Sequence, residues 1–415
     1  MNTLVDRLVP ARLGRSFRWL LASSWTTNLG DGIALAAGPL LVASLTRDPF
    51  LISLAAVFGW APPLVFGLYA GVLSDRRDRR RIVLAANAAR VALLTGLIAA
   101  IATGTLSATV ALLALGLLAT TEVFADNTSA TLPPMLVHRD DLVVANARLQ
   151  TGFITLNQLA GPPIGAALFA AGTVWPFATE VILDLAGLLM VTRLVLPAHG
   201  RAADAAVRNM RQDVVEGFRW TVRHPAVRTL LLTILIFNVS FGAAWSVLVL
   251  YAQQQLGLGP VGFGLLSTVS ALGGLLGTGL YGRLTSRIRL GDLMRIGLII
   301  ETLTHLILAL TRSAWVASVV FFLFGAHAFV WGTTSVTVRQ RAVPQHLQGR
   351  VGSLNTLCVY GGLVVGAPLG GALAGAYGVA APFWFAFAAS AVFVVLLWRE
   401  LTRIATEDAA QPAVA

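Results

Sequence analysis

At residues 71–83 the chain reads GVLSDRRDRRRIV, a dense group of charges in an otherwise apolar sequence. Positions 75–81 hold only aspartate and arginine. Across all 415 residues, 56% are hydrophobic and only 12% are charged, which is about half the charged share of a typical soluble domain. A charge group of this density between long apolar runs indicates a loop that joins two membrane-crossing segments.

Apolar runs of about 20 residues or more recur along the whole chain. A helix of that length crosses a hydrocarbon core about 30 Å thick and satisfies its own backbone hydrogen bonds there. The sequence therefore predicts an all-α membrane protein with twelve transmembrane helices. We expect these helices at residues 17–45, 51–74, 81–103, 106–130, 143–171, 174–196, 226–254, 260–284, 291–311, 314–338, 351–376 and 379–399.

The basic residues predict the orientation of these helices. All 30 of them are arginines. In the loops expected on one side of the membrane there are only two arginines, Arg47 and Arg312. Because basic residues collect on the cytoplasmic side, we expect a multi-pass protein of the inner (plasma) membrane with both termini in the cytoplasm. The net charge of +11 then reflects topology and contact with anionic lipids, and we expect no nucleic-acid partner.

The two halves of the chain resemble each other. GPPIGAAL at 161–168 matches GAPLGGAL at 366–373, and TSAT at 128–131 matches TSVT at 334–337. Repeats of this kind are typical of secondary transporters, so we expect two pseudo-symmetric six-helix bundles. The predicted domains are an N-terminal bundle (1–196), a cytoplasmic linker (197–225) containing a surface helix, a C-terminal bundle (226–399) and a cytoplasmic tail (400–415).

Three stretches carry a resemblance to the major facilitator superfamily that covers essentially the full chain. Residues 71–81 resemble its signature loop between helices 2 and 3. Residues 130–150, ATLPPMLVHRDDLVVANARLQ, resemble the helix 4–5 connection of its multidrug and siderophore exporter branch, which includes enterobactin-exporter-like and macrolide-efflux-like proteins. Residues 157–168, NQLAGPPIGAAL, partly resemble the helix-5 antiporter signature, with Asn157 and Ala166 in place of glycines.

This resemblance implies a cytoplasmic gate around the opening stretch. Gly71 lets helix 2 approach a neighbour closely, and Asp75 accepts bonds from the N-terminus of helix 11 near Arg350. Arg76 and Arg79 then face Asp126 on helix 4. The alternative is a solvated charge run that only sets topology. We also expect helix kinks at Pro162, Pro163 and Pro368.

Ionisable residues inside the spans are costly, so each is a candidate for function. The helices expected to line the central cavity carry Asp31, Glu122 and His327, which we predict to serve proton coupling or substrate binding. The alternatives are a structural hydrogen bond near Gly30 and Gly32 for Asp31, pairing with Arg90 or Arg148 for Glu122, and a packed neutral ring for His327.

Two further pairs lie on helices outside that cavity. Glu180 and Asp184 are one turn apart on helix 6 and are interpreted as a polar cluster near the interface. Glu301 and His305 are also one turn apart and are expected to satisfy each other.

Aromatic and amide side chains supply the rest of a predicted lipophilic substrate cavity. The alternative for each is packing or lipid contact. The candidates are Trp25, Asn28, Asn238, Phe241, Trp245, Phe329 and Trp331.

The predicted function is export of lipophilic or amphipathic small molecules by alternating access with proton antiport, performed by a monomer. Two alternatives remain: a proton-coupled importer of a small metabolite, and a transport-inactive scaffold or sensor. The chain has no Walker-type glycine loop, no metal-ligand spacing and no serine elbow, so we expect neither an enzyme nor a metal or cofactor.

Overall fold

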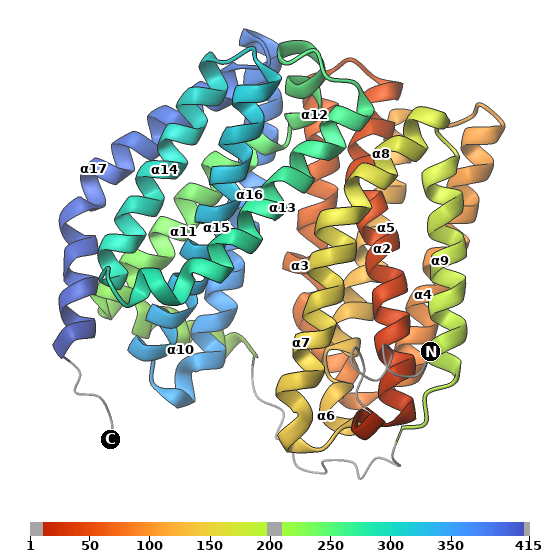
Figure 1. Cartoon of the computed structure of the whole chain (residues 1–415), viewed down its shortest axis with the longest axis horizontal. Coiled ribbons are helices and arrows are strands. Elements are labelled where there is room, and N and C mark those ends of the chain that lie inside the picture. The colour runs from red at the N-terminus through yellow and green to blue at the C-terminus, as the bar shows by residue number, and fades with distance from the viewer. Residues whose placement is uncertain (1–10, 197–209, 411–415) are drawn as a thin grey trace. The chain divides into compact units, whose positions relative to one another are not determined.

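The computed structural model describes residues 11–196 and 210–410, and within them all regular structure is helical (Figure 1). In the first half the long helices are α2 (Gly14–Leu45), α3 (Pro49–Arg76), α4 (Arg79–Ala102), α5 (Ala108–Ser129) and α9 (Trp175–Thr192). In the second half they are α11 (Pro225–Trp245), α13 (Pro260–Thr285), α14 (Leu290–Leu310), α15 (Ala314–Ala342), α16 (Gln348–Tyr377) and α17 (Ala381–Ala410).

The described part of the chain contains 11 helices that are long and apolar enough to cross a membrane. The remaining predicted span, 143–171, is built from three pieces. These are α7 (Leu142–Gly152), the π-helix η3 (Phe153–Ala160) and α8 (Gly161–Ala171). The predicted all-α fold with twelve membrane-crossing segments is confirmed, and its fifth segment is interrupted by a change of helical pitch.

The chain folds into two compact units. The N-terminal unit comprises Met1–Arg47, Phe58–Arg201 and Leu258–Thr268. The C-terminal unit comprises Asp48–Val57, Ala202–Gly257 and Val269–Ala415. The first turns of α3 therefore group with the C-terminal unit and those of α13 with the N-terminal unit, a detail absent from the predicted division into bundles at 1–196 and 226–399.

The two units repeat one packing scheme. In the N-terminal unit α2 packs on α8 and α9, and α4 packs on α5 and α9. In the C-terminal unit α11 packs on α16 and α17, and α14 packs on α15 and α17. These pairs occupy equivalent places in the two halves of the sequence, in agreement with the internal repeat.

The linker helix predicted from its charge spacing is present as α10 (Met210–Arg223), which packs on α16 and α11. Residues 197–209 of the predicted linker lie outside the described residues, as do 1–10 and the last part of the predicted tail, 411–415. Up to Ala410 that tail continues α17 as helix.

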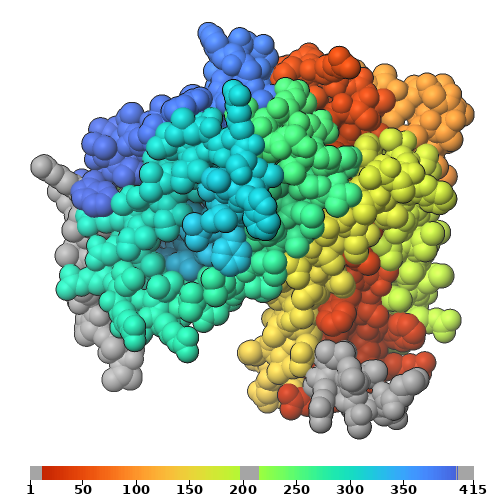
Figure 2. Space-filling model, turned by 45° about the horizontal axis from the view of Figure 1, so that its top comes forward, coloured from red at the N-terminus to blue at the C-terminus, as the bar shows by residue number. Residues whose placement is uncertain are grey.

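Apolar side chains on the outer faces of the helices are exposed, as expected for a protein whose solvent there is lipid. On α15, Trp315, Val319 and Leu323 recur one turn apart and are more than half exposed. Figure 2 shows α14 and α15, in teal and cyan, at the surface of the C-terminal unit. The buried core of this unit lies between α11, α14, α16 and the end of α15, and includes Leu230, Leu298, Val338 and Val351.

Candidate transport sites

Arg90 of α4 is the centre of a buried ionic cluster in the N-terminal unit. Its Nη2 contacts Asp31 Oδ1 of α2 and lies 2.6 Å from Glu180 Oε1 of α9, and its Nε lies 3.0 Å from Asp184 Oδ2. The side chains of Arg90 and Asp31 are 6% and 9% exposed, and those of Glu180 and Asp184 are 1% and 0% exposed. We call these four residues the Arg90 cluster.

Local sequence explains why the four groups meet. Glu180 and Asp184 are one turn apart on α9 and therefore face the same neighbours. Small residues let α2 and α9 approach closely, since a Cβ at Gly30 would lie 3.4 Å from Glu180 Cγ and one at Gly187 only 2.8 Å from Thr27 Cγ2. A buried hydrogen bond from Ser23 Oγ to the carbonyl of Gly187, 3.0 Å long, fixes the register of the two helices.

The Arg90 cluster has more acids than it has positive charge. One guanidinium faces three carboxyl groups, and Glu180 Oε2 and Asp184 Oδ1 have no hydrogen-bond partner among the described residues. Burying an uncompensated charge is expensive unless the group is paired or protonated. The cluster is therefore suited to hold protons, and its net charge depends on how many it holds.

This geometry changes the interpretation of several acids. Asp31 is an ion-pair partner of Arg90, and its Oδ1 accepts no hydrogen bond from the glycines beside it or from any other described residue. Glu180 and Asp184, interpreted above as an interfacial polar cluster, are instead the most deeply buried acids of the site. Glu122 makes no ion pair with Arg90 within 4 Å, and neither Glu122 nor Asp126 forms a hydrogen bond or ion pair through its carboxylate among the described residues.

The predicted cytoplasmic gate is only partly recognisable within the N-terminal unit. Asp75 lies 3.5 Å from Arg79, one turn away, and its side chain is 72% exposed. Arg79 donates to the carbonyl of Ser74 and to Met135 Sδ. Within the described part of the chain, neither Arg76 nor Arg79 makes the predicted contact with Asp126. A Cβ at Gly71 would meet nothing within 4 Å, so the expected close helix approach is also not seen.

Two other contacts, made by residues of the predicted gate or next to them in sequence, were not predicted from the sequence. Asp78 is the N-cap of α4, where its side chain accepts from the backbone N–H of Arg81 at 3.1 Å. Arg350, near the start of α16, lies 2.5 Å from Glu216 of the linker helix α10. The Arg350 guanidinium thus ties the linker helix to α16, and its role in a gate with Asp75 stays a prediction.

In the C-terminal unit the predicted pairing of Glu301 with His305 is wrong. Glu301 instead lies 3.6 Å from His327 Nε2 across the α14–α15 interface. His305 packs edge-on against the Trp245 indole, with ring centroids 5.9 Å apart. The tertiary contact between two helices outweighs the one-turn spacing within α14.

Most of the predicted cavity side chains are engaged in packing or local bonds. Trp25 donates to the carbonyl of Arg148, and the amides of Asn28 and Asn238 donate to carbonyls of their own helices. Phe241 and Trp245 stack on each other at 4.3 Å within an aromatic group that includes Phe324. Trp331 packs against the core of the C-terminal unit.

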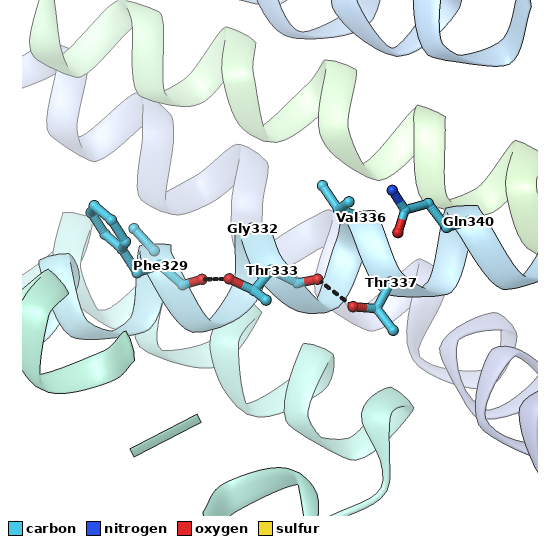
Figure 3. Close-up of a pocket in the computed structure, with 7 residues that line it drawn as sticks. Phe329, Gly332, Thr333, Val336, Thr337 and Gln340 are labelled. Atoms are coloured by element: carbon cyan, nitrogen blue, oxygen red, sulfur yellow. Dashed lines mark hydrogen bonds between the residues drawn. The ribbon is translucent and has the colours of Figure 1, made fainter. Parts of the chain in front are cut away.

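Phe329 is the predicted cavity residue that lines an open hollow, about 650 Å³ in volume, along one face of α15 (Figure 3). The hydroxyls of Thr333 and Thr337 donate to helix carbonyls one turn earlier, so the hydrogen atoms of both hydroxyls are already engaged. A side-chain amide, that of Gln340, lies at one end. The lining residues are Ala328, Phe329, Gly332, Thr333, Val336, Thr337 and Gln340.

The predicted kink prolines occupy two different settings. Pro162 and Pro163 lie in the first turn of α8, directly after the π-helix η3, so they remove two backbone N–H donors at the junction of the two pieces. Pro368 lies inside α16, which runs as one helix from Gln348 to Tyr377. Among the described residues no group of three or more His, Cys, Asp or Glu side chains is arranged to hold a metal ion.

Twelve membrane-crossing segments in two units with one repeated packing scheme, and with ionic side chains buried inside them, define a helical membrane transporter. The chain belongs to the transmembrane secretion effector family of the major facilitator superfamily, whose sequence model matches residues 8–414. It is a multi-pass membrane protein and not an enzyme.

Named relatives include two bacterial exporters. The enterobactin exporter EntS of Salmonella typhimurium is 24% identical over 367 residues, 86% of this chain and 85% of the relative. The multidrug efflux pump Tap of Mycolicibacterium fortuitum is 27% identical over 387 residues, 88% of this chain and 90% of the relative.

Solved structures share the fold at low sequence identity. A bacterial homologue of the iron transporter ferroportin aligns with a TM-score of 0.73 and 16% identity, covering 93% of this chain and 98% of that one. The nucleoside transporter NupG aligns with a TM-score of 0.76 and 10% identity, covering 93% of this chain and 100% of that one.

Proposed function

We propose that this protein exports amphipathic or lipophilic small molecules in exchange for protons. The observation that carries the proposal is the Arg90 cluster, in which three buried carboxyl groups share one guanidinium. Two relatives named above are exporters, which supports the direction of transport and the class of substrate. We further propose that the protein lies in the inner membrane of the cell, that both of its termini face the cytoplasm, and that it acts as a monomer.

Proton exchange at the Arg90 cluster follows from charge balance. With all three carboxyl groups ionised the cluster has a net charge of about −2, a state that burial strongly disfavours. Proton uptake removes that charge, and proton loss restores it. Because Asp31 lies on α2 and Glu180 on α9, a change in protonation alters the attraction between helices that pack on each other, and this is a physical means of coupling.

The hollow on α15 is our candidate for part of the substrate site. Its lining is mostly apolar, with one aromatic ring at Phe329 and one amide at Gln340. Such a surface suits molecules that bury apolar area and offer a few polar groups. The gate around Asp75 and Arg350 is proposed to close the cytoplasmic side, on the strength of the family resemblance.

The proposal is tested by transport into everted membrane vesicles with an imposed pH gradient. A lipophilic cation, a macrolide and a catecholate siderophore serve as probes of three chemical classes. Uptake of at least one probe that collapses with the pH gradient is the expected result. No uptake of any probe, or uptake indifferent to the gradient, would contradict proton-driven export.

Glu122 offers a first variant. We expect Glu122→Gln to abolish gradient-driven uptake, because Glu122 is an ionisable residue inside a membrane-crossing helix that packs on α2 and α4, the helices of Asp31 and Arg90. We expect little loss of stability, because the Glu122 carboxylate forms no ion pair among the described residues. Uptake in vesicles and the apparent unfolding temperature are measured together. Asp126→Asn, one turn away on the same helix, is the matched control and should retain most of the activity. Parent-like uptake in Glu122→Gln would remove Glu122 from coupling.

Gly332 offers a second variant, directed at substrate. A Cβ at Gly332 would meet nothing within 4 Å, and Gly332 lines the hollow, so Gly332→Trp adds an indole at the hollow. We expect the apparent affinity for a transported probe to fall by about tenfold or more, while Gly332→Ala stays close to the parent. Concentration dependence of uptake provides the comparison. Parent-like affinity in Gly332→Trp would exclude the hollow as a substrate site.

A further inference from the structure

A second buried polar cluster lies between α14 and α15 in the C-terminal unit. It consists of Glu301 and His305 on α14 and His327 and Trp331 on α15. His305 is fully buried and His327 is 6% exposed. Glu301 Oε2 and His327 Nε2 are 3.6 Å apart, which is within ion-pair distance but too long for a hydrogen bond.

The nitrogen atoms of this cluster are poorly satisfied. Both ring nitrogens of His305, Nδ1 of His327 and Nε1 of Trp331 are buried without a hydrogen-bond partner among the described residues. A buried polar group that is left unpaired loses its hydration and gains nothing in return. Such groups are normally satisfied by buried water or by a bound ligand, so four in one cluster point to an occupant.

Two of these nitrogens lie beside the same point in space. Gly297 of α14 has no side chain, and a Cβ there would lie 2.8 Å from Trp331 Cδ1 and 3.0 Å from His327 Nδ1. The indole Nε1 is bonded to Cδ1, so the indole N–H and His327 Nδ1 can share one bridging water. The glycine thus provides the space that the two side chains use.

We propose that this cluster is a proton-binding site, in which His327 takes up the proton, Glu301 is the counter-ion and water bridges His327 Nδ1 to the Trp331 indole. A carboxylate 3.6 Å from the ring gains most when the ring is an imidazolium. His305, with no acid paired to it among the described residues, stays neutral.

Other titratable groups near the cluster are committed elsewhere. The Tyr251 hydroxyl of η4 (Tyr251–Gln255) donates to the carbonyl of Leu308 at 2.7 Å. The Tyr281 hydroxyl of α13 lies 3.5 Å from Thr334, two turns beyond His327. Arg295 of α14 lies 3.3 Å from Asp292. Of the described residues, Glu301 is the acid paired with His327.

Protonation changes what His327 can do for Trp331. In the neutral ring with the proton on Nε2, Nδ1 is an acceptor that suits the indole donor, directly or through water. In the imidazolium both nitrogens are donors, so the bridging water can no longer donate to Nδ1 and has to accept from both N–H groups. Trp331 packs against the core of the C-terminal unit and directly precedes Gly332 and Thr333 of the α15 hollow, so we expect a shift of its indole to move the stretch of α15 that lines the hollow. This last step rests on the proposed function, whereas proton binding does not.

The test is a pH titration of Trp331 fluorescence in the full-length protein held in lipid nanodiscs. Because the chain has 10 tryptophans, the Trp331 signal is isolated as the difference between the parent and Trp331→Phe. This signal reports protonation of His327, because an imidazolium quenches a nearby indole. We expect a single pH-dependent transition in this signal. It should disappear in His327→Gln and move to lower pH by about one unit or more in Glu301→Gln.

His138, whose side chain is 78% exposed, provides the control, and His138→Gln should titrate like the parent. A parent protein without a Trp331 titration, or a titration that survives in folded His327→Gln, would overturn the proposal. If His327→Gln does not fold, an unshifted titration in Glu301→Gln overturns it instead. A normal titration together with absent vesicle transport would contradict the proposed function alone.

Discussion

Replacing Arg90 with glutamine should abolish gradient-driven transport and lower the apparent unfolding temperature by several degrees or more. The variant leaves three buried carboxyl groups, those of Asp31, Glu180 and Asp184, without their counter-ion. Removing one partner of a buried ion pair costs about 3–5 kcal/mol, because the remaining charge stays uncompensated. The apparent unfolding temperature is measured in detergent, by heating samples and monitoring the remaining folded protein by size-exclusion chromatography.

Two comparisons make this result specific. Arg81→Gln removes a guanidinium from the same helix, but its side chain is 87% exposed, so we expect almost no change in unfolding temperature. Arg90→Gln combined with Asp184→Asn removes one of the uncompensated acids and should recover part of the stability without recovering transport. The loss in Arg90→Gln should also be smaller at acidic pH, where the carboxyl groups are protonated. Parent-like stability of Arg90→Gln at neutral pH would mean that the cluster does not hold the unit together.

Gly32→Ala should have a smaller but still large effect. A Cβ at this position would lie 2.5 Å from the Asn157 carbonyl oxygen and 2.9 Å from Gly161 Cα. Both are backbone atoms, so the helix pair must separate to relieve the clash. Overpacking of this kind costs about 1–3 kcal/mol, and the shift also displaces the adjacent Asp31 from Arg90. We expect a lower unfolding temperature and uptake that is slower by about tenfold or more.

Gly96→Ala is the matched control for this substitution. Gly96 lies in α4, and a Cβ there would meet nothing within 4 Å. Alanine is favoured over glycine inside a helix by about 0.5–1 kcal/mol, so this variant should be as stable as the parent or slightly more stable. If Gly32→Ala and Gly96→Ala unfold at the same temperature, the close contact of α2 with η3 and α8 does not limit stability.

The fold could be predicted from the sequence because its signals are strong and repeated. Each apolar run has to be long enough to span the membrane, and arginines such as Arg76 and Arg79 have to stay on one side of the membrane. Most helix ends fall within a few residues of the predicted ones because charges and turn residues bound the runs. Two do not: α11 ends at Trp245 where the predicted span runs to 254, and α17 continues to Ala410 where the predicted span ends at 399. The change of pitch at Phe153–Ala160 has a weaker signal. Pro162 and Pro163 predict a kink just after it, but the apolar residues of the stretch itself are common to π- and α-helices.

The candidate sites are less predictable, because partners depend on which helices pack together. Asp31, Glu180 and Asp184 are all evident in the sequence as costly acids. Their shared partner Arg90 is not, because Arg90 is considered from the sequence only as a partner of Glu122. The same rule that selects the acids, an ionisable residue inside an apolar run, applies equally to Arg90. For Glu301 the one-turn spacing favours His305, whereas the packing of α15 on α14 supplies His327.

The π-helix η3 also affects how the antiporter-like stretch 157–168 should be aligned with other proteins. Each π turn holds about one residue more than an α turn, which amounts to about 100° of rotation around the helix axis. Side chains before Phe153 and after Ala160 therefore do not share the faces that a spacing of about 3.6 residues would assign to them. In a relative whose fifth segment has a uniform pitch, the residue aligned with Asn157 could face a different neighbour from the one that Asn157 faces here. Sequence identity across this stretch is therefore a poor guide to structural equivalence.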